Sequence, residues 1–465
     1  MLTAELVSCL GRDAVLTERE DLLCYAYDAT GKSFMPDVVV FPRTVSHIAR
    51  VMQLANEYQV CVIPRGAGSG MTGGSLPESG GIVLVLTQFD RILEIDAQNL
   101  VAVVEPGVVT TQLHRAVEAQ GLFYPPDPAS MNFSTIGGNI AENSGGMRAV
   151  KYGTTKEYVL GLEVVLPTGE VIHTGSKCVK DVVGYNLTQL VVGSEGTLGV
   201  VTKAILKLVP LPASKKTLTA TFPSILDAGK TVSEIIRRKI IPTTMEFLDR
   251  QAIWCVDQYL QMGLAPGAGA FMLIEVDGDE DEVEANILKV REVCASNKAL
   301  DIQVAATARE QDELWRMRRS VSASLAHLKP EAKVNEDIVV PRARIPEIIE
   351  FIESMSTRYE VQIVNFGHAG DGNIHLNVLP RKGQLEKAHQ AVEEIFDKTI
   401  ELGGRISGEH GIGTSKRDYI HKNLEPAAIA AMQAIKRAWD PNNILNPGKI
   451  FPPPGANMNN GAGND

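Results

Sequence analysis

The chain has 465 residues, of which 44% are hydrophobic and 22% charged, and its formal net charge is -11 at pH 7. This length predicts two or three domains with substantial cores. The negative charge, with no basic run to offset it, argues against non-specific nucleic-acid binding. No apolar stretch approaches the ~20 residues that a transmembrane helix needs. The N-terminus lacks a signal-peptide pattern, so we expect a cytoplasmic protein, with peripheral membrane association through a partner left open.

The six cysteines are scattered, at positions 9, 24, 61, 178, 255 and 294. Their spacing matches neither a disulfide framework nor a zinc or iron–sulfur cluster. We therefore expect reduced cysteines in the core. A redox reaction in this chain would have one cofactor and no internal electron relay.

The first half of the chain has the pattern of strands that alternate with helices. We expect strands near residues 38–41, 60–63, 81–86, 100–104, 160–166 and 200–208, and helices near 46–58 and 110–119. Pro210 and Pro212 indicate a domain boundary after this α+β part.

A second part begins near Leu218. It contains an expected strand at 271–276 and a long expected helix near 309–328. After residue 403 the chain is punctuated by glycines and then becomes helical. The tail from 452 to 465 lacks core-forming side chains, so we expect it to be disordered.

A glycine-rich loop, PRGAGSGMTGGS, occupies residues 64–75 directly after an expected strand. Glycines let consecutive backbone N–H groups converge on an anion such as a pyrophosphate. Part of the loop matches the GxGxxG dinucleotide fingerprint, but that motif requires a helix at this point. Gly74, Pro77 and Gly80 follow instead. The loop is thus a candidate phosphate site or a plain surface loop, and the nicotinamide Rossmann interpretation is rejected.

Two further glycine clusters lie in the same part of the chain. One runs from PPDP through TIGGN to ENSGG, within residues 125–146, and the other is VGSEGTLGVV at 192–201. Three such runs between strands, rich in Asn, Ser and Thr, suggest one long ligand enclosed by backbone. A cofactor with two phosphates and two ring systems, such as FAD, has the right size.

In this order, the three runs resemble the FAD-binding domain of the vanillyl-alcohol-oxidase/PCMH superfamily, in its branch of FAD-linked D-2-hydroxyacid dehydrogenases. The resemblance covers nearly the whole chain and implies an α+β fold. Its parts would be a PCMH-type two-subdomain FAD-binding domain (1–212), a ferredoxin-like substrate or cap domain (213–402), a C-terminal helical segment that returns to the flavin (403–451) and a tail (452–465). Gly68 and Ser69 stand where relatives with covalent FAD often carry a histidine, so we expect non-covalent FAD.

The same resemblance implies the flavin contacts. The first loop would hold the pyrophosphate, the second run would line the flavin, and the third would contact the adenine and ribityl side. The implied residues are Pro64, Arg65, Gly66, Ala67, Gly68, Ser69, Gly70, Thr72, Gly73, Gly74, Ser75, Asp127, Ser130, Gly137, Gly138, Asn143, Ser144, Gly146, Glu195, Gly199 and Val201.

A second constellation is VNFGHAGDGNIHLNV, residues 364–378. Apolar alternation on both sides of AGDG predicts a β-hairpin with a four-residue turn. In that register His368 pairs with Asn373, and His375 is a diagonal neighbour of His368, about 7–8 Å away at the backbone. Two imidazoles placed in this way can reach one metal ion, and a one-residue register slip would separate them.

Glu409 and His410 lie in another glycine-flanked motif, SGEHGIG. Two histidines and one glutamate suit zinc, iron or manganese with positions open for substrate. The residues alone leave hydrogen-bonded structural histidines as the alternative. The resemblance favours the metal, because by analogy His368, His375 and Glu409 would bind a divalent ion. His410 would then be the catalytic base.

The resemblance also implies the substrate, a small D-2-hydroxy acid, with glycolate or D-lactate favoured over D-2-hydroxyglutarate. Arg318 and Lys333 are the candidate anchors for its carboxylate, and Asn373 would orient it. A solvated helix face is the alternative for the arginine. In the expected reaction a hydride passes to flavin N5 while His410 takes the hydroxyl proton, which gives the 2-keto acid.

Re-oxidation of the flavin requires an external acceptor, since no cluster-binding cysteines are present. An electron-transferring flavoprotein, a quinone or an iron–sulfur subunit would serve, and a homodimer is left open. Two other functions stand beside the dehydrogenase. One is a flavin-dependent transferase of the alkyl-dihydroxyacetonephosphate synthase type, without net oxidation. The other is a non-catalytic flavin subunit of a larger oxidase.

Overall fold

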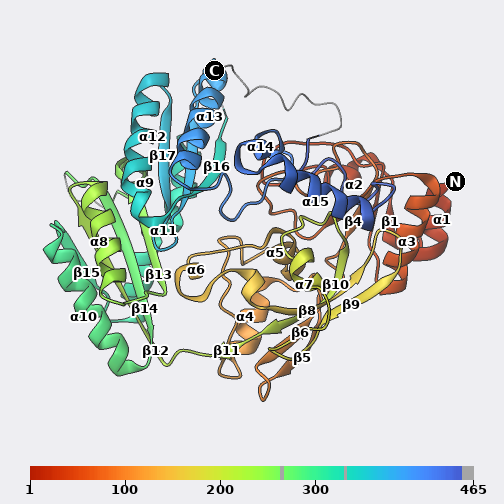
Figure 1. Ribbon diagram of the computed structural model, residues 1–465, viewed down its shortest axis with the longest axis horizontal. Coiled ribbons are helices and arrows are strands. Elements are labelled where there is room, and N and C mark those ends of the chain that lie inside the picture. Colours follow the sequence, from red (N-terminus) through yellow and green to blue (C-terminus); the bar gives the residue numbers. More distant parts are fainter. Residues whose placement is uncertain (262–266, 329–331, 453–465) are drawn as a thin grey trace. The chain divides into compact units, whose positions relative to one another are not determined.

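The computed structural model describes residues 1–261, 267–328 and 332–452 of the chain (Figure 1). The chain forms two compact units. The first comprises Met1–Gly145, Thr154–Leu211 and the chain from His410 onward, and the second comprises Gly146–Gly153 and Pro212–Glu409. The chain therefore passes from one unit to the other four times, after Gly145, Gly153, Leu211 and Glu409.

The first unit contains two main sheets and a short ribbon. One sheet has the order β1-β2-β4-β3, in which β2, β4 and β3 are parallel and β1 is antiparallel to β2. The other is antiparallel, in the order β5-β6-β10-β8-β9, and β11 pairs with β7. The strands are β1 (Val15–Leu16), β2 (Val38–Val40), β3 (Val62–Arg65), β4 (Ile82–Val85), β5 (Ile92–Asp96), β6 (Val101–Val104), β7 (Leu122–Phe123), β8 (Val159–Val165), β9 (Val171–Gly175), β10 (Val200–Lys207) and β11 (Val209–Pro210).

The helices of the first unit surround these sheets. They are α1 (Leu2–Leu10), α2 (Arg19–Leu23), α3 (Val45–Tyr58), α4 (Thr110–Glu118), α5 (Ile136–Glu142), α7 (Leu187–Val191), α14 (Ile420–Asn423) and α15 (Pro426–Trp439). Helix α3 shows how a capping residue and the spacing of apolar residues determine a helix. It starts where the Thr44 hydroxyl accepts a hydrogen bond from His47 N, and it buries Ile48, Met52 and Ala55 at helical spacing.

The C-terminal segment packs into the core of the first unit. Val62 N donates to Ile444 O at 2.8 Å and Asn446 N donates to Val62 O at 2.8 Å, so this segment extends the edge of β3. Ile444 and Leu445 are buried in the same core as α3. The last forty or so residues before the tail thus belong to the unit that carries the first glycine loop.

The second unit is built on one antiparallel seven-stranded sheet, in the order β15-β12-β14-β13-β17-β18-β16. The strands are β12 (Ser214–Phe222), β13 (Thr244–Asp249), β14 (Ala270–Gly278), β15 (Asp301–Val304), β16 (Val334–Val339), β17 (Gln362–His368) and β18 (Asn373–Leu379). The helices are α6 (Ala149–Tyr152), α8 (Ile225–Arg237), α9 (Arg250–Leu260), α10 (Glu280–Ser296), α11 (Ala308–His327), α12 (Ile345–Tyr359) and α13 (Leu385–Glu401).

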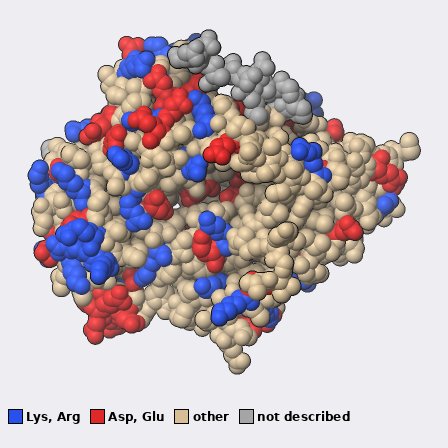
Figure 2. Space-filling model, viewed as in Figure 1, with Lys and Arg blue, Asp and Glu red and all other residues tan. Residues whose placement is uncertain are grey.

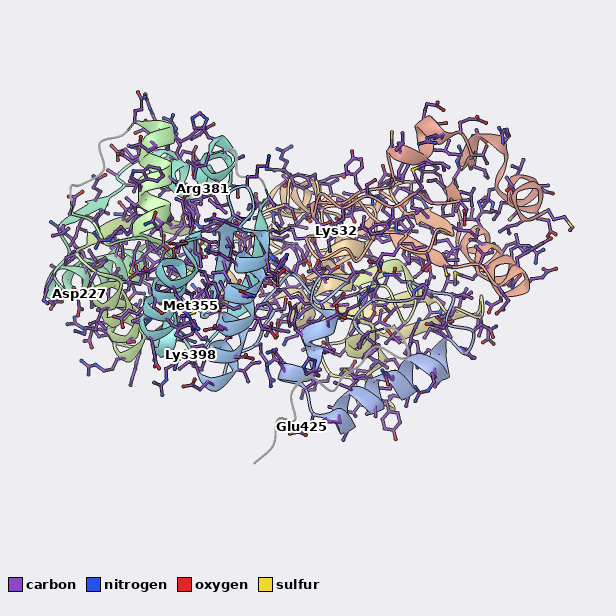
Figure 3. All side chains as sticks on the ribbon, turned by 90° about the horizontal axis from the view of Figure 1, so that it is seen from above. Lys32, Asp227, Met355, Arg381, Lys398 and Glu425 are labelled. Carbon is purple, nitrogen blue, oxygen red and sulfur yellow. The ribbon has the colours of Figure 1, made fainter. Side chains whose placement is uncertain are left out.

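Helices cover this sheet in two groups. Helices α9 and α11 pack on strand residues that include Leu248, Phe271 and Phe366. Helices α10, α8, α12 and α13 form a second group in which each contacts the next. Figure 3 labels Met355 on α12 and Lys398 on α13, and the ammonium group of Lys398 lies 3.5 Å from Glu347 of α12. Figure 2 shows acidic and basic side chains in separate small groups, with broad uncharged areas between them.

The segment 146–153 is tied to the second unit by polar contacts. The Lys151 ammonium donates to the backbone carbonyl of Asp277 at 2.8 Å and to its carboxylate at 2.5 Å. The Tyr152 hydroxyl donates to the same carboxylate at 2.9 Å. Because Asp277 is buried on β14, these bonds anchor α6 to the sheet.

Asp249 joins β13 to α9 through its side chain. The buried carboxylate accepts hydrogen bonds from Ala252 N at 2.7 Å and from Asn365 N and Nδ2 at 2.9 and 2.8 Å. Burial raises the pKa of Asp249 to about 7 and outweighs these hydrogen bonds, which lower it.

A pH-dependent stability follows from this carboxyl group. Between pH values near 3.8 and 7 the folded state retains a proton that the unfolded state has released, so the free energy of unfolding should fall as pH rises. The slope from one group is at most about 1.4 kcal/mol per pH unit. Asp249→Asn should remove this slope, as measured by denaturant unfolding across that range. An unchanged slope in the variant would contradict the raised pKa.

Most expected elements of the sequence are present with shifted ends, as for α3 and for the long helix α11. The expectation for the cysteines is right only in part, because Cys255 and Cys294 are buried whereas Cys24 and Cys178 are exposed. Except for residue 452, the expected disordered tail lies outside the described residues. Among the helices of the described part, none combines the length and apolarity that crossing a bilayer demands.

Candidate active site

The two histidines of the candidate metal site lie on one face of the sheet of the second unit. Glu246 on β13 is opposite His368 on β17, and His368 is opposite Asn373 on β18. Two residues along, Phe366 is opposite His375, which is opposite Asp337 on β16. Side chains in one row, and in rows two residues apart, project to the same side of a sheet. Strand pairing thus gathers them from segments more than 100 residues apart.

The predicted hairpin and its register are confirmed. Strands β17 and β18 flank a four-residue turn, and His368 pairs with Asn373. Gly372 in the turn has φ +91, and a Cβ there would lie 1.9 Å from Val340 O. Glycine is therefore required at this position. The turn keeps both histidines on one face, with ring centroids 5.1 Å apart.

Glu409 reaches the histidines because a buried carboxylate holds its loop. Asp337 Oδ2 accepts hydrogen bonds from Gly408 N at 2.8 Å and from Glu409 N at 2.6 Å. Asp337 Oδ1 accepts from the Ser407 hydroxyl at 3.0 Å. Asp337 is fully buried and stands opposite His375. It fixes the backbone of the loop beside the hairpin, and the sequence interpretation missed it.

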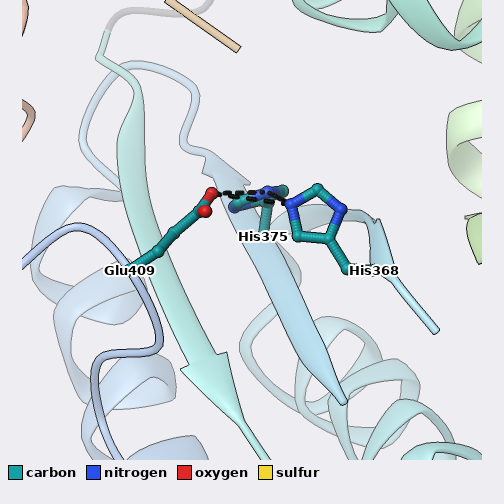
Figure 4. A group of neighbouring side chains, drawn as sticks. All are labelled: His368, His375 and Glu409. Atoms are coloured by element: carbon teal, nitrogen blue, oxygen red, sulfur yellow. Dashed lines mark hydrogen bonds and ion pairs between the residues drawn. The ribbon is translucent and has the colours of Figure 1, made fainter. Parts of the chain in front are cut away.

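Three ligand atoms converge in this cluster (Figure 4). The Nε2 atoms of His368 and His375 are 3.3 Å apart, and each lies 3.5 Å from Glu409 Oε1. These atoms could hold one metal ion. Ligands about 2.1 Å from a tetrahedral ion lie about 3.4 Å from one another, so the donor set and its spacing fit a divalent ion such as zinc.

The electrostatics of His368 are dominated by two carboxylates. Burial alone lowers the pKa of His368, but Glu246 and Glu409 outweigh it and hold that pKa well above its ordinary value. Conversely, burial raises the pKa of Glu246, whereas His368 and Arg318 lower it further than burial raises it. Glu246 and Glu409 therefore favour positive charge at His368, whether a proton or a metal ion carries it.

The three predicted substrate-binding residues, Arg318, Asn373 and Lys333, differ in burial and in their contacts. Arg318 lies on α11, is 9% exposed, and stacks over the Phe366 ring at 4.8 Å, beside the cluster. Asn373 donates to Ile338 O at 3.0 Å and lies against Gly408. Lys333 is exposed just before β16. The structure thus brings Arg318 and Asn373 to the metal ligands, and the roles of all three residues stay predictions.

The first glycine loop follows β3 in the first unit. The buried Arg65 side chain braces it from within, since its guanidinium donates to Tyr27 O at 2.8 Å and to the Ser75 hydroxyl at 3.3 Å. A Cβ at Gly66 would lie 2.4 Å from the Thr135 hydroxyl, and one at Gly73 would lie 2.3 Å from the Thr414 hydroxyl. The glycines thus leave room for the side chains of Thr135 and Thr414 against the loop backbone. A loop without Cβ atoms at these positions fits a cradle made of N–H groups.

The other two runs are partly explained by packing. A Cβ at Gly137 would lie 2.6 Å from Pro106, and one at Gly199 would lie 2.3 Å from Val164. The Asn143 side chain accepts from Lys156 N and the Thr154 hydroxyl. Gly146 belongs to the second unit. These contacts are compatible with flavin binding but also give the residues structural roles, and the flavin contacts stay predictions.

The loop that carries His410 is held by residues from the first and third runs. The Thr72 hydroxyl donates to His410 O at 3.2 Å. The buried Glu195 carboxylate accepts from Ile412 N at 2.8 Å and Gly413 N at 2.6 Å. Burial raises the pKa of Glu195 more than these amides lower it. The side chain of Glu195 therefore binds the protein loop.

The sequence interpretation missed three residues that organise these sites. Glu246 and Asp337 sit on strands without a recognisable motif. Asn446 Nδ2 donates to Gly74 O at 2.9 Å and to Glu195 O at 2.8 Å, and so joins the first and third runs to the C-terminal segment. A polar residue at a buried strand position is only a weak signal, and Asn446 lies in no strand, so no local pattern singles these three residues out.

The sequence matches two family models in succession. Residues 36–175 match the FAD binding domain, and residues 211–450 match the C-terminal domain of FAD linked oxidases. The chain is 49% identical over 433 residues to the glycolate oxidase subunit GlcD of Bacillus subtilis, with 92% of each chain covered. The chain belongs to the FAD-linked oxidases. This FAD-linked oxidase is an oxidoreductase with an FAD-binding domain, as the sequence predicted.

Other relatives of the FAD-linked oxidase have different names. It is 36% identical to a D-lactate dehydrogenase of Anaerostipes hadrus, with 89% of each chain covered. It is 32% identical to a D-2-hydroxyglutarate dehydrogenase of Stutzerimonas stutzeri, with 97% of this chain and 98% of the relative covered.

Solved structures show the fold of the FAD-linked oxidase. p-Cresol methylhydroxylase matches it with a TM-score of 0.80 over 97% of this chain and 96% of the other, at 19% identity. Alkyldihydroxyacetonephosphate synthase matches with a TM-score of 0.76 over 96% of this chain and 84% of the other, also at 19% identity. The expected α+β fold of the PCMH type is confirmed.

Proposed function

We propose that this FAD-linked oxidase oxidises a small D-2-hydroxy acid, glycolate or D-lactate in preference to D-2-hydroxyglutarate, to the 2-keto acid. The convergence of His368, His375 and Glu409 carries the proposal, because these donors would form a cation site suited to a hydroxycarboxylate. The relatives named for glycolate, D-lactate and D-2-hydroxyglutarate support the same substrate class.

Bound FAD supplies the hydride acceptor. His368, His375 and Glu409 would hold a divalent ion, zinc, iron or manganese, whose Lewis acidity favours ionisation of a hydroxyl group. The guanidinium of Arg318, helped by Lys333, would bind the substrate carboxylate, and Asn373 would orient the substrate. The His410 imidazole would take the hydroxyl proton, which an imidazole can do near neutral pH.

The proposed reaction requires a bound FAD and an external electron acceptor. FAD would be non-covalent, since Gly68 and Ser69 offer no attachment side chain. Electrons would leave to an external acceptor, an electron-transferring flavoprotein, a quinone or an iron–sulfur subunit, and the chain could form a homodimer. Its functional parts would be 1–212 for FAD, 213–402 for the substrate and 403–451 for the GEHG loop and the helices after it.

A panel of anaerobic reactions tests this function. Glycolate, D-lactate, L-lactate and D-2-hydroxyglutarate are each mixed with the FAD-loaded protein, and loss of the flavin absorbance is recorded. We expect a D-2-hydroxy acid or glycolate to bleach the flavin and L-lactate to leave it oxidised. A protein whose flavin no hydroxy acid reduces would instead fit the transferase or the non-catalytic subunit.

A further inference from the structure

Glu246 lies beside the cluster, in contact with His368, but belongs to no motif. It sits on β13, directly opposite His368 in the strand pairing, and is 0% exposed. A buried carboxylate is costly unless charged or hydrogen-bonded partners surround it. The hydrogen-bonding and charged partners of Glu246 therefore indicate its role.

Each oxygen of Glu246 has one partner. Glu246 Oε1 lies 2.6 Å from His368 Nδ1, and Glu246 Oε2 accepts a hydrogen bond from Arg318 Nε at 2.6 Å. The carboxylate thus bridges a candidate metal ligand and the candidate substrate anchor. These two residues are 50 positions apart in the chain and belong to β17 and α11.

The bond to His368 determines which ring nitrogen can bind a metal. A carboxylate only accepts hydrogen bonds, so Nδ1 must carry the proton. In the neutral ring, Nε2 then has the free electron pair, and Nε2 is the atom that faces His375 and Glu409. A hydrogen bond to a carboxylate also makes the ligand nitrogen more basic and fixes the orientation of the ring.

The bond to Arg318 determines how its guanidinium is presented. Glu246 binds Nε, and the ring of Phe366 lies 4.8 Å below the guanidinium carbon. Among the described residues, none accepts a hydrogen bond from the two terminal nitrogens of Arg318. Their paired geometry matches a carboxylate, so the arginine is held in place while its carboxylate-binding edge stays available.

From this geometry we propose that Glu246 is a positioning residue that couples the metal site to the substrate anchor, by fixing the tautomer of His368 and the orientation of Arg318 at the same time. The proposal rests on the proposed function and deepens it. Glu246→Gln keeps the size of the side chain but leaves one acceptor oxygen for two donors. One of the two residues must then lose its partner.

The test measures metal binding separately from activity. Co²⁺ is titrated into the FAD-loaded protein and into Glu246→Gln, Glu246→Asp and His375→Ala, with the absorption spectrum of Co²⁺ as the readout. Glu275→Gln is the matched control. Glu275 is a buried glutamate of the same sheet that accepts from Thr217 and Trp315, outside the metal ligands.

We expect Glu246→Gln to weaken Co²⁺ binding about 10- to 100-fold and to alter the spectrum, and Glu275→Gln to bind like the parent protein. Glu246→Gln should also raise KM for the hydroxy acid, because Arg318 loses its support. Glu246→Asp, which keeps the charge, should recover part of the affinity and serves as the second variant if Glu246→Gln does not fold.

Three outcomes would overturn the proposal. If the parent protein binds Co²⁺ and His375→Ala does not, but Glu246→Gln matches the parent in affinity and spectrum, Glu246 has no positioning role and the proposed function stands. Equal weakening in Glu246→Gln and Glu275→Gln would show a general effect of removing a buried charge. A parent protein that binds no Co²⁺ would overturn both this proposal and the metal site.

Discussion

Replacing His410 by alanine should slow the anaerobic reduction of the flavin by hydroxy acid by a factor of about 10²–10⁴, the usual contribution of a positioned general base. The backbone of its loop is held by other residues, because Thr72 binds His410 O and Glu195 binds Ile412 N and Gly413 N. The loop should therefore keep its conformation when the imidazole is removed. The rate is measured by stopped-flow absorbance of the flavin.

Two controls separate a catalytic role from a structural one. His173→Ala removes an exposed histidine of the same unit, which pairs with Glu163 at 3.0 Å, and should leave the rate unchanged. The pH profile of the reduction rate should differ between His410→Ala and the parent protein, because the variant lacks the proposed base. If the His410 variant reduces its flavin at the parent rate, another group must take the proton.

Replacing His375 by alanine should remove the bound divalent ion and abolish most of the hydroxy-acid oxidation. The variant loses one of three converging ligands, and the remaining two, His368 Nε2 and Glu409 Oε1, are 3.5 Å apart. Two ligands hold an ion far more weakly than three. Elemental analysis of the purified protein by mass spectrometry gives the metal content per chain.

His327→Ala is the matched control for His375. It removes an exposed histidine at the end of α11 in the same unit, which contacts the Tyr259 ring at 5.8 Å. Its metal content should equal that of the parent protein. The FAD content of every variant should stay unchanged, because the glycine loops lie in the other unit. Equal metal content in His375→Ala and the parent protein would refute the metal site.

Several features could be predicted because they depend on interactions between residues that are close together in the sequence. Alternating apolar residues around AGDG determine the hairpin, and a one-residue slip would turn both histidines to the other face of the sheet. The order of the three glycine runs predicts the FAD domain through its family resemblance. Each run is short, and a Cβ at Gly66 or Gly73 would clash with the side chain of Thr135 or Thr414. The expected α+β fold, the FAD-binding domain and the family all depend on such short segments.

The supporting residues could not be predicted from local pattern. Glu246 is 122 positions from His368, and Asp337 is 72 positions from Glu409. Both carboxylates lie in strands whose neighbours are chosen by the pairing of the whole sheet. In a linear pattern each is a polar residue at a buried position, which usually counts against a strand.

The sequence by itself determined the hairpin register, the glycine loops and the set of ionisable residues, because backbone sterics and side-chain alternation act over a few residues. Only the tertiary structure decided which carboxylate holds which histidine and which loop. That choice depends on the strand order β13-β17-β18-β16, which brings Glu246, His368, His375 and Asp337 onto one face. Burial then makes each of these polar contacts strong, since no water competes for the charges.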